Sequence, residues 1–334
     1  MMNIYSQNQK MTKIDLKDRK ILYELDLNCR QSNTQIGKKV GLKKDLVAYR
    51  IKKMEDEGII KFYWTAIDTF KLGYNVFRIY VSFQYVNSKV KQEIIQHFIN
   101  YHNTWTVKTH RGEVDLAMVL WVKNIYEFYR FWDETLDKYE DFFSKAIVSI
   151  YIHAKSYKKS YILPNPDDVN DREMYTATCS GETIPTDEID YKILNELAVN
   201  ARIPLIQLAD KLKSTSQVVN YRIKNLQTKG IIQAYRVHLD LPKLGLQHFK
   251  IDIYLKEHKK RKAIIDYLKQ KPFFECLNVS VGWCDIEPEF IVKDVDELTD
   301  ILADLDGKFP NSIKKQSFWI LDKNHKERWL PEMN

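Results

Sequence analysis

Cysteine and glycine are both scarce in this chain of 334 residues. The cysteines are scattered and form no Cys-x-x-Cys pair, which argues against a zinc site or a disulfide framework; they are Cys29, Cys179, Cys276 and Cys284. The glycines number 10, and the chain holds no Gly-x-Gly-x-x-Gly or Walker sequence. We therefore expect no metal site, no cofactor and no nucleotide-dependent chemistry.

Long apolar runs are missing as well. No stretch of about 18 apolar residues occurs, so a membrane span is not expected. Residues 1–6 lack the basic and then apolar pattern of a secretory signal, and with the unpaired cysteines this predicts a cytoplasmic protein. Lysine and arginine (52) exceed the acidic residues (45), giving a net charge of +7. This mild excess fits a protein that meets a polyanion.

The chain repeats itself. Residues 18–73 align without a gap with residues 190–245, at an offset of 172, and 23 of the 56 positions are identical. The longest shared runs are Tyr49–Lys52 with Tyr221–Lys224 and Gly58–Ile60 with Gly230–Ile232. A period of this length is too long for a solenoid and indicates a duplicated two-domain unit.

Each copy begins with a pattern of three short helices. Asp15 can cap the first helix of copy one, and Ser32 has the spacing of a capping box before the second. Gly58 supplies a left-handed stop after the third helix, as Gly230 does in copy two. The β-prone stretches 59–67 and 231–239 follow, and we interpret each as a two-stranded wing. This order predicts a winged helix-turn-helix.

The second part of each copy alternates strand and helix patterns. In copy one, strands are expected at 76–86, on both sides of residues 111–113 within 105–122, and at 146–155, with helices at 89–101 and 125–143. Copy two repeats this order from residue 249 to residue 321. The fold class is therefore α+β, with two copies of a winged helix-turn-helix followed by a ferredoxin-like βαββαβ domain.

These patterns divide the chain into six segments. Three prolines and many small polar residues mark the stretch between the copies as a loop-like linker. The predicted segments are an N-terminal arm (1–13), winged helix-turn-helix 1 (14–68), effector domain 1 (69–160), the linker (161–185), winged helix-turn-helix 2 (186–240) and effector domain 2 (241–334).

The motifs resemble those of the leucine-responsive regulatory protein (Lrp/AsnC) family. They are Asp15-x-x-Asp18-x-x-Ile21-Leu22-x-x-Leu25-x-x-Asn28-x-Arg30, Arg50-Ile51-x-x-Met54-x-x-x-Gly58-Ile59-Ile60, Leu72-Gly73 and Gly112-x-x-Asp115, and copy two repeats them up to Gly282-x-x-Asp285. The resemblance covers nearly the whole chain and implies a transcription regulator that binds double-stranded DNA. The usual Ser-Pro-Ser opening of the recognition helix is replaced in both copies, so the two copies are expected to prefer different sequences.

The third helix of each copy is the candidate recognition helix. Lysine and arginine there can neutralise phosphates, and amide side chains can bind base edges in the major groove. The alternative is an ordinary solvated helix face. The candidate DNA-binding residues are Lys43, Lys44, Asp45, Ala48, Tyr49, Arg50, Lys52 and Lys53 in copy one, and Thr215, Ser216, Gln217, Asn220, Tyr221, Arg222 and Lys224 in copy two.

The resemblance also implies a small-molecule site, for an amino acid, near the loop between the two central strands of each effector domain. The candidate ligand-binding residues are Arg111, Gly112, Glu113, Asp115, Gly282 and Asp285. We favour the plainer interpretation, in which each glycine makes a turn and each aspartate caps loop amides.

An enzyme is the alternative class. Siroheme decarboxylases resemble this family too, and their chemistry relies on a His-Asn-Tyr-x-Arg type of stretch. Here Tyr101–Trp105 keeps a His-Asn pair, but the tyrosine and arginine that should follow are missing. No catalytic residue is therefore predicted. The paired effector domains could form within one chain, as a pseudo-symmetric monomer, or between chains, as a dimer or larger homo-oligomer.

Overall fold

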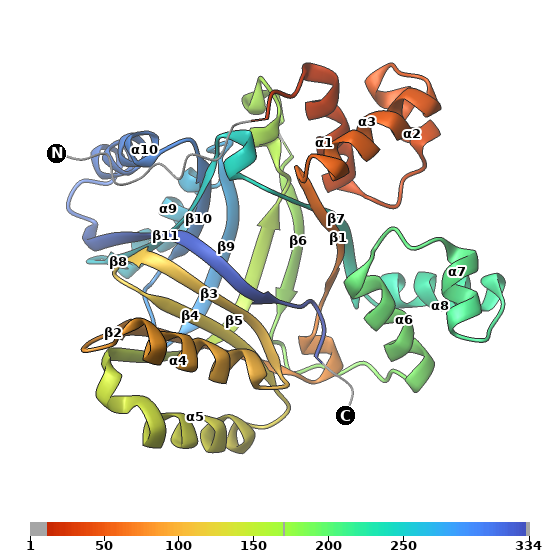
Figure 1. Cartoon of the computed structure of the whole chain (residues 1–334). Helices are drawn as coiled ribbons and strands as arrows, with labels where there is room; N and C mark the ends of the chain where they lie inside the picture. Colours follow the sequence, from red (N-terminus) through yellow and green to blue (C-terminus); the bar gives the residue numbers. More distant parts are fainter. Residues whose placement is uncertain (1–11, 170, 332–334) are drawn as a thin grey trace.

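The computed structural model describes residues 12–169 and 171–331. A closed ring of strands, carrying helices on its outer surface, forms one part of the molecule, and two small helical units project from one side of it (Figure 1). Most of the predicted N-terminal arm lies outside the described residues. No helix in the described part of the chain has the length and apolar character needed to cross a bilayer.

The first helical unit, head one, folds from local signals. Asp15 and Asp18 form a reciprocal capping box at the start of its first helix, and Ser32 and Gln35 do the same at the second. Gly58 follows the third helix with φ +66°. Head one comprises α1 (Leu16–Leu27), α2 (Asn33–Val40), α3 (Lys44–Asp56) and β1 (Ile60–Ile67).

The second unit, head two, repeats this plan. Asp187 caps its first helix and Thr215 its third, and Gly230 takes φ +67° after the third helix. Head two comprises α6 (Glu188–Val199), α7 (Leu205–Lys211), α8 (Ser216–Thr228) and β7 (Ile232–Leu239).

The predicted two-stranded wings are wrong. Each of the stretches 59–67 and 231–239 forms one continuous strand, and β1 pairs antiparallel with β7 of the other copy. Neither stretch contains glycine, proline or asparagine to make a tight turn, so each strand finds its partner in the other copy. Trp64 pairs with Arg236, which occupies the equivalent position of the repeat, so the pseudo-twofold axis passes between them.

The effector halves have the predicted βαββαβ order. Copy one orders its strands β3-β4-β2-β5 and copy two orders its strands β9-β10-β8-β11, all antiparallel. Copy one comprises β2 (Asn75–Phe83), α4 (Ser88–Asn100), β3 (Thr104–Gly112), β4 (Leu116–Val122), α5 (Ile125–Tyr139) and β5 (Phe143–Tyr157). Copy two comprises β8 (Gln247–Leu255), α9 (Arg261–Leu268), β9 (Phe274–Val281), β10 (Glu287–Val292), α10 (Val295–Lys308) and β11 (Ile313–Glu327).

The two effector sheets join into one closed structure within the single chain. The last strand of each copy crosses to the other sheet, since β5 pairs with β9 and β11 pairs with β3. Because β5 also pairs with β2, eight strands close into a ring. The pairing of effector domains that was left open by the sequence therefore occurs inside one chain.

The predicted linker is only partly a loop. Strand β6 (Glu173–Thr178) extends the sheet at β5, pairing His153 with Thr178 and Tyr157 with Glu173. Its alternation of apolar and hydroxyl side chains suits a strand at a sheet edge, a signal that the nearby prolines obscured. Short 3₁₀ turns lie at Phe70–Leu72, Glu140–Phe142, Ser160–Ile162 (η3), Pro166–Asp168, Pro242–Leu244 and His258–Lys260.

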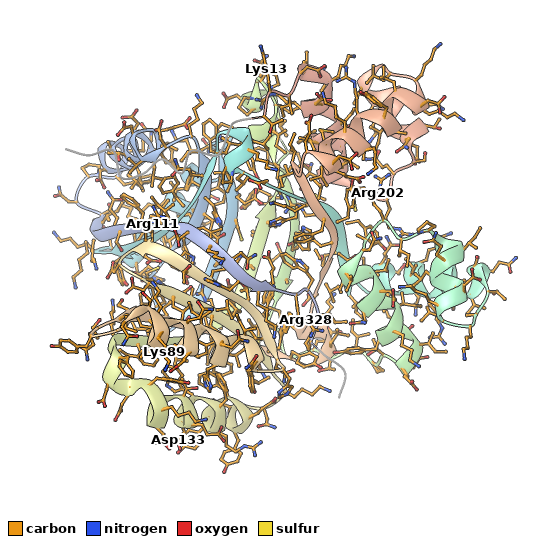
Figure 2. The ribbon with its side chains drawn as sticks, in the orientation of Figure 1. Lys13, Lys89, Arg111, Asp133, Arg202 and Arg328 are labelled. Carbon is orange, nitrogen blue, oxygen red and sulfur yellow. The ribbon has the colours of Figure 1, made fainter. Side chains whose placement is uncertain are left out.

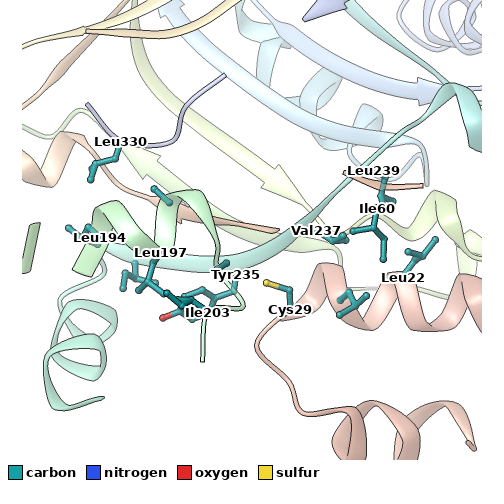
Figure 3. Packing of buried hydrophobic residues seen from close by; sticks show 14 of the residues in the cluster. Leu22, Cys29, Ile60, Leu194, Leu197, Ile203, Tyr235, Val237, Leu239 and Leu330 are labelled. Carbon is teal, nitrogen blue, oxygen red and sulfur yellow. The ribbon is translucent and has the colours of Figure 1, made fainter. Parts of the chain in front are cut away.

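The two heads share one apolar cluster. Leu22 and Ile60 of head one pack near Val237 and Leu239 of head two (Figure 3). Helix α1 packs on β7 and α6 packs on β1, so each head rests on a strand of the other copy. The effector halves keep separate clusters under their own helices.

Candidate nucleic-acid interface

Helices α3 and α8 each bury one face and leave the rest on the surface. In α3 the buried side chains are Val47, Ile51 and Met54. In α8 they are the equivalent residues, Val219, Ile223 and Leu226. This spacing by three and four residues is that of a helix seated on its own head. The remaining faces are free to meet a ligand.

Most of the sequence-predicted DNA-binding residues lie on these outer faces. Tyr49 is 65% exposed and Tyr221, its equivalent, 72% exposed. The other exposed candidates are Lys43, Lys44, Asp45, Ala48, Lys52, Lys53, Thr215, Gln217 and Lys224, whereas Arg50, Ser216, Asn220 and Arg222 are partly buried. The structure thus brings the exposed candidates of each head onto one helix surface.

Arg50 and Arg222 are already engaged by the protein. The Nη1 atom of Arg50 lies 2.7 Å from Asp15 and 2.8 Å from Asp18, at the start of α1. Arg222 makes the same contacts with Asp187 and Asp190, at 2.7 and 2.9 Å. The backbone N–H of Asp18 and the Arg50 guanidinium lower the pKa of Asp15. Each arginine therefore ties its recognition helix to the first helix of its own head.

The far end of each recognition helix is held by the other copy. Lys71 Nζ donates to the carbonyl of Lys229, the C-cap of α8, at 2.9 Å, and Lys243 Nζ donates to the carbonyl of Glu57, the C-cap of α3. A cation at a helix C-terminus is favoured by the helix dipole. A Cβ on Gly58 would lie 2.8 Å from Lys243 Nζ, and one on Gly230 would lie 2.6 Å from Lys71 Nζ. Because a lysine tip can shift aside, it is the positive φ, +66° and +67°, that favours glycine at both positions.

A second pair of reciprocal contacts joins the heads directly. Arg30 Nη1 donates to the carbonyls of Ala201 (2.6 Å) and Ile203 (3.2 Å). Arg202 Nη1, its equivalent, donates to the carbonyl of Cys29 at 2.8 Å. Figure 2 shows Arg202 between the two heads. Sequence reasoning missed this role, although identity at these two positions of the repeat was a signal for it.

The effector-loop candidates are occupied by the protein itself. Asp115 accepts from the backbone N–H of Phe83 and Asp285 from that of Leu255, both at 2.8 Å. Arg111 pairs with Asp322 at 2.6 Å, and Glu113 lies 2.9 Å from Lys315 and 3.2 Å from Lys145. Each aspartate thus caps a backbone amide, but that amide is at the end of a strand, β2 or β8, and not in the loop as the sequence suggested.

The two loop glycines lie where the effector domains meet. A Cβ on Gly112 would lie 2.9 Å from the carbonyl oxygen of Phe318, on β11 of copy two. A Cβ on Gly282 would lie 2.8 Å from the carbonyl oxygen of Val148, on β5 of copy one. Both glycines have positive φ. Their role in the structure is to allow close approach between the two copies.

A charged cluster lies inside the strand ring. Asp252, Cys284 and Glu287 bring ligand-type atoms within 4.8 Å of one another. The Glu287 carboxylate, however, pairs with Arg78 at 2.6 Å and with Lys250 at 3.1 Å. The Asp252 carboxylate accepts from the indole N–H groups of Trp283 and Trp319. Because protein donors already serve both carboxylates, the cluster is an internal ion network.

The His-Asn pair of the stretch that was compared with siroheme decarboxylases contacts another side chain of the protein. Asn103 Nδ2 donates to Glu127 at 2.7 Å, and His102 Nε2 lies 3.8 Å from the same carboxylate. Asn103 is buried, whereas the His102 side chain is 42% exposed. The pair lies at the turn between α4 and β3, where it fastens the start of α5.

Comparison with known proteins agrees with this architecture. A family model described as winged helix-turn-helix DNA-binding matches residues 14–61 and again residues 186–233. The chain is 31% identical over 137 residues to the HTH-type transcriptional regulator LrpA of Pyrococcus horikoshii, which spans 41% of this chain and 97% of that protein. It is 45% identical over 60 residues to the proline dehydrogenase transcriptional activator of Rhodobacter capsulatus, 18% of this chain and 39% of that protein.

A likeness over the whole chain is found with a solved structure. The siroheme decarboxylase NirDL superposes with a TM-score of 0.62, covering 95% of this chain and 94% of that one, at 11% sequence identity. This likeness shows that the fused fold is shared and says nothing of activity. The matched winged helices, their recurrence in both halves and the match to almost all of LrpA lead to one conclusion. The chain belongs to the Lrp/AsnC family and contains two of its units in tandem.

Proposed function

We propose that this protein is a transcription regulator that binds specific sites in double-stranded DNA through α3 and α8. One observation carries the proposal: a single closed ring presents two recognition helices whose outer faces are exposed and related by the pseudo-twofold axis. A pair of helices related in this way fits two successive turns of a major groove. Because both heads belong to one chain, binding of the first raises the effective concentration of the second.

The proposal gives the exposed lysines the phosphate contacts. Lys43 and Lys44 lie at the N-terminus of α3, and Lys224 lies on α8. All three are exposed, and no ion pair involving them is found within the described residues. Arg50 and Arg222 are assigned to holding the helices in place, since two carboxylates already neutralise each of them.

The proposal places no ligand at the effector loops. Asp115 and Asp285 each accept a hydrogen bond from a backbone amide at the end of a strand. Arg111 and Glu113 are paired with charges of opposite sign. The relatives named as regulators and the paired heads both favour DNA binding over catalysis.

Salt-dependent DNA binding tests the proposal. Fluorescence anisotropy with a labelled random duplex would compare the parent chain with a Lys43→Ala/Lys44→Ala/Lys224→Ala variant across a salt series. Each phosphate contact removed should reduce the slope of log K against log salt by about 0.9. The control variant is Lys259→Ala/Lys260→Ala/Lys262→Ala, which removes the same charge from an exposed basic run on the effector half.

The outcomes separate the sites. A shallower slope in the α3/α8 variant alone would support the proposal. Equal changes of the slope in both variants would indicate that the DNA-binding surface is not confined to the recognition helices, which would contradict the proposal. Absence of binding by the parent at about 50 mM salt would overturn the proposal, because electrostatic contacts should dominate there.

A further inference from the structure

We propose that the two heads read unlike half-sites, head one centred on G·C pairs and head two on A·T pairs, so that the protein requires a non-palindromic site. This inference rests on the proposed function and goes beyond it, because it names the sequence class that each head selects. It comes from comparing the two recognition helices position by position in the structure.

The middle of the two helices is unchanged, whereas their last four residues differ. Tyr49, Arg50, Ile51 and Lys52 are repeated exactly as Tyr221–Lys224. The isoleucines are buried, and the arginines bind the carboxylates of the first helix of each head. The identical isoleucine and arginine therefore hold the helix in its head, whereas the identical tyrosine and lysine are exposed and offer the same groups in both heads.

The first five residues of the two helices differ at every position except one buried valine. Lys44, Asp45 and Ala48 of α3 correspond to Ser216, Gln217 and Asn220 of α8. The residue buried between them, Val47, has the same identity in copy two as Val219. The N-terminal residues of a recognition helix are the ones that contact base edges. The two copies thus differ in the first turn, where a helix of this kind contacts bases, and agree at the buried valine and at the arginine that holds the helix.

The side chains of head one suit G·C pairs. A lysine donates to the O6 and N7 acceptors of guanine, and a carboxylate accepts from the cytosine amine. Lys44 and Asp45 supply these two groups on adjacent exposed positions in the first turn of α3. Ala48 lies one turn later and offers only a methyl group, which fits a thymine methyl at the edge of such a half-site.

The side chains of head two suit A·T pairs. Gln217 and Asn220 carry amides that can donate to N7 and accept from the N6 amine of adenine at the same time. They are three residues apart on α8 and therefore lie on the same face. Within the described residues neither amide has a hydrogen-bond partner, unlike Thr215, whose hydroxyl caps the helix by accepting from the N–H of Val218. No charged residue occurs among these positions in head two.

The contacts that hold the recognition helices are equivalent in the two heads. The arginine to carboxylate ties, the lysine at the C-cap and the clamp between the heads recur in both copies with the same residues. Since these contacts to the recognition helices are the same in both copies, we assign the difference in sequence preference to the differing side chains.

Selection of bound sequences from a random duplex library tests the inference. The parent should enrich a site with a G·C-centred half and an A·T-centred half, each preferred base pair being favoured by roughly tenfold. A Ser216→Lys/Gln217→Asp/Asn220→Ala variant gives head two the reading side chains of head one, and it leaves Thr215 as the cap. This variant should enrich an inverted repeat of the G·C-centred half-site.

The reciprocal variant serves as the matched control. Lys44→Ser/Asp45→Gln/Ala48→Asn should enrich an inverted repeat of the A·T-centred half-site instead, with an unchanged circular dichroism spectrum. If the parent enriches two identical half-sites, or if either graft leaves its half-site unchanged, the inference is overturned while DNA binding stands. If the parent enriches no sequence but still binds duplex, the sequence-specific part of the proposed function fails as well.

Discussion

The two contacts between heads and strand ring occupy equivalent places and are built from opposite chemistry. Under head one, Asp26, Arg236, Lys159 and Glu275 form a buried ionic network, which we call junction one. Under head two, the equivalent positions hold Ala198, Trp64, Trp329 and Trp105, which we call junction two. Equivalent positions are 172 residues apart in the heads and 170 apart in the effector halves, as Gly112 and Gly282 are. The same place in the repeat thus holds ionic side chains in one copy and mainly aromatic side chains in the other.

The stability of junction one depends on the geometry of its ion pairs. Arg236 donates to both oxygens of Asp26, at 2.9 and 2.8 Å, and Lys159 lies 3.1 Å from Asp26 and 3.2 Å from Glu275. Asp26 is fully buried, which by itself would raise its pKa, but Arg236 and Lys159 outweigh the burial and lower it. Such a network is stable in one geometry only, because breaking any ion pair leaves an uncompensated charge buried away from water.

The stability of junction two depends on the contact area between its aromatic rings. Trp64 and Trp329 stack with ring centroids 3.6 Å apart, and Trp105 meets Trp329 edge-on at 5.9 Å. A hollow of about 200 Å³ lies beside the stack, between Phe62 and the C-terminal part of α6. Stacked apolar rings contribute through contact and dispersion, and they allow small shifts at little cost. The comparison predicts that head one is held rigidly and head two with more freedom.

Breaking the ionic network should give the largest effect. Asp26→Ala leaves the Arg236 guanidinium buried without its main partner, so we expect a loss of about 3–5 kcal/mol in the free energy of unfolding. The double variant Asp26→Ala/Arg236→Leu removes the uncompensated charge and should recover more than half of that loss. Urea unfolding followed by circular dichroism measures both. A double variant as unstable as the single one would show that charge burial is not the cause.

Truncating the aromatic stack should cost less. Trp329→Ala removes the ring that packs on Trp64, and because Trp329 is only partly buried we expect a loss of about 2–3 kcal/mol. Trp329→Phe keeps an aromatic face and should lose less than half as much. The same urea titration provides the measurement. A larger loss than that of Asp26→Ala would reverse the proposed order of the two junctions.

Where the copies are identical, the effects should be equal. Arg30→Ala removes two hydrogen bonds to backbone carbonyls of the other head, and Arg202→Ala removes one to the Cys29 carbonyl and one to Asn33 Oδ1, so each should cost about 1–2 kcal/mol. The pair serves as an internal standard for pseudo-symmetry in the same unfolding assay. A twofold difference between them would mean that the asymmetry of the junctions reaches the clamp between the heads.

Mild acid should act on the side of junction two. Burial lowers the pKa of His238, which stacks on Phe62, to about 4. A histidine whose pKa is lowered in the folded state contributes its full stability above the unfolded value near 6.5, and that contribution is lost as the pH falls toward 4. Between pH 7.5 and 5.5 the loss should be about 1 kcal/mol. His238→Phe should remove this part of the pH dependence of the urea midpoint, and an unchanged profile would contradict the assignment.

Local signals in the sequence predicted the elements closely. The caps at Asp15 and Ser32, and the stops at Gly58 and Gly230, act within a few residues of the chain, so they can be recognised without knowledge of the fold. The repeat itself revealed the duplicated architecture. The prediction of wings failed because pairing of β1 with β7 joins residues 165 to 179 apart in the chain, and nothing local distinguishes a hairpin partner from a distant one.

The candidate interface shows the same division. The sequence placed lysines and amides on the third helix of each head, since composition and spacing decide which side chains a helix can offer. It also counted Arg50 and Arg222 among the DNA contacts, whereas the fold places each beside two carboxylates about 30 residues earlier in the chain. Which cations are already paired depends on which helices meet, and helix packing is a tertiary property.

By itself the sequence determined that the chain contains two copies of one unit, where their helices begin and end, and that the reading positions of the copies differ. Only the tertiary structure decided that the copies pair with each other, by exchanging β5 and β11 and by joining β1 to β7. The physical reason is that helices and caps are stabilised by neighbours in the chain, whereas a strand edge or a buried charge is satisfied by whichever partner the closed fold brings to it.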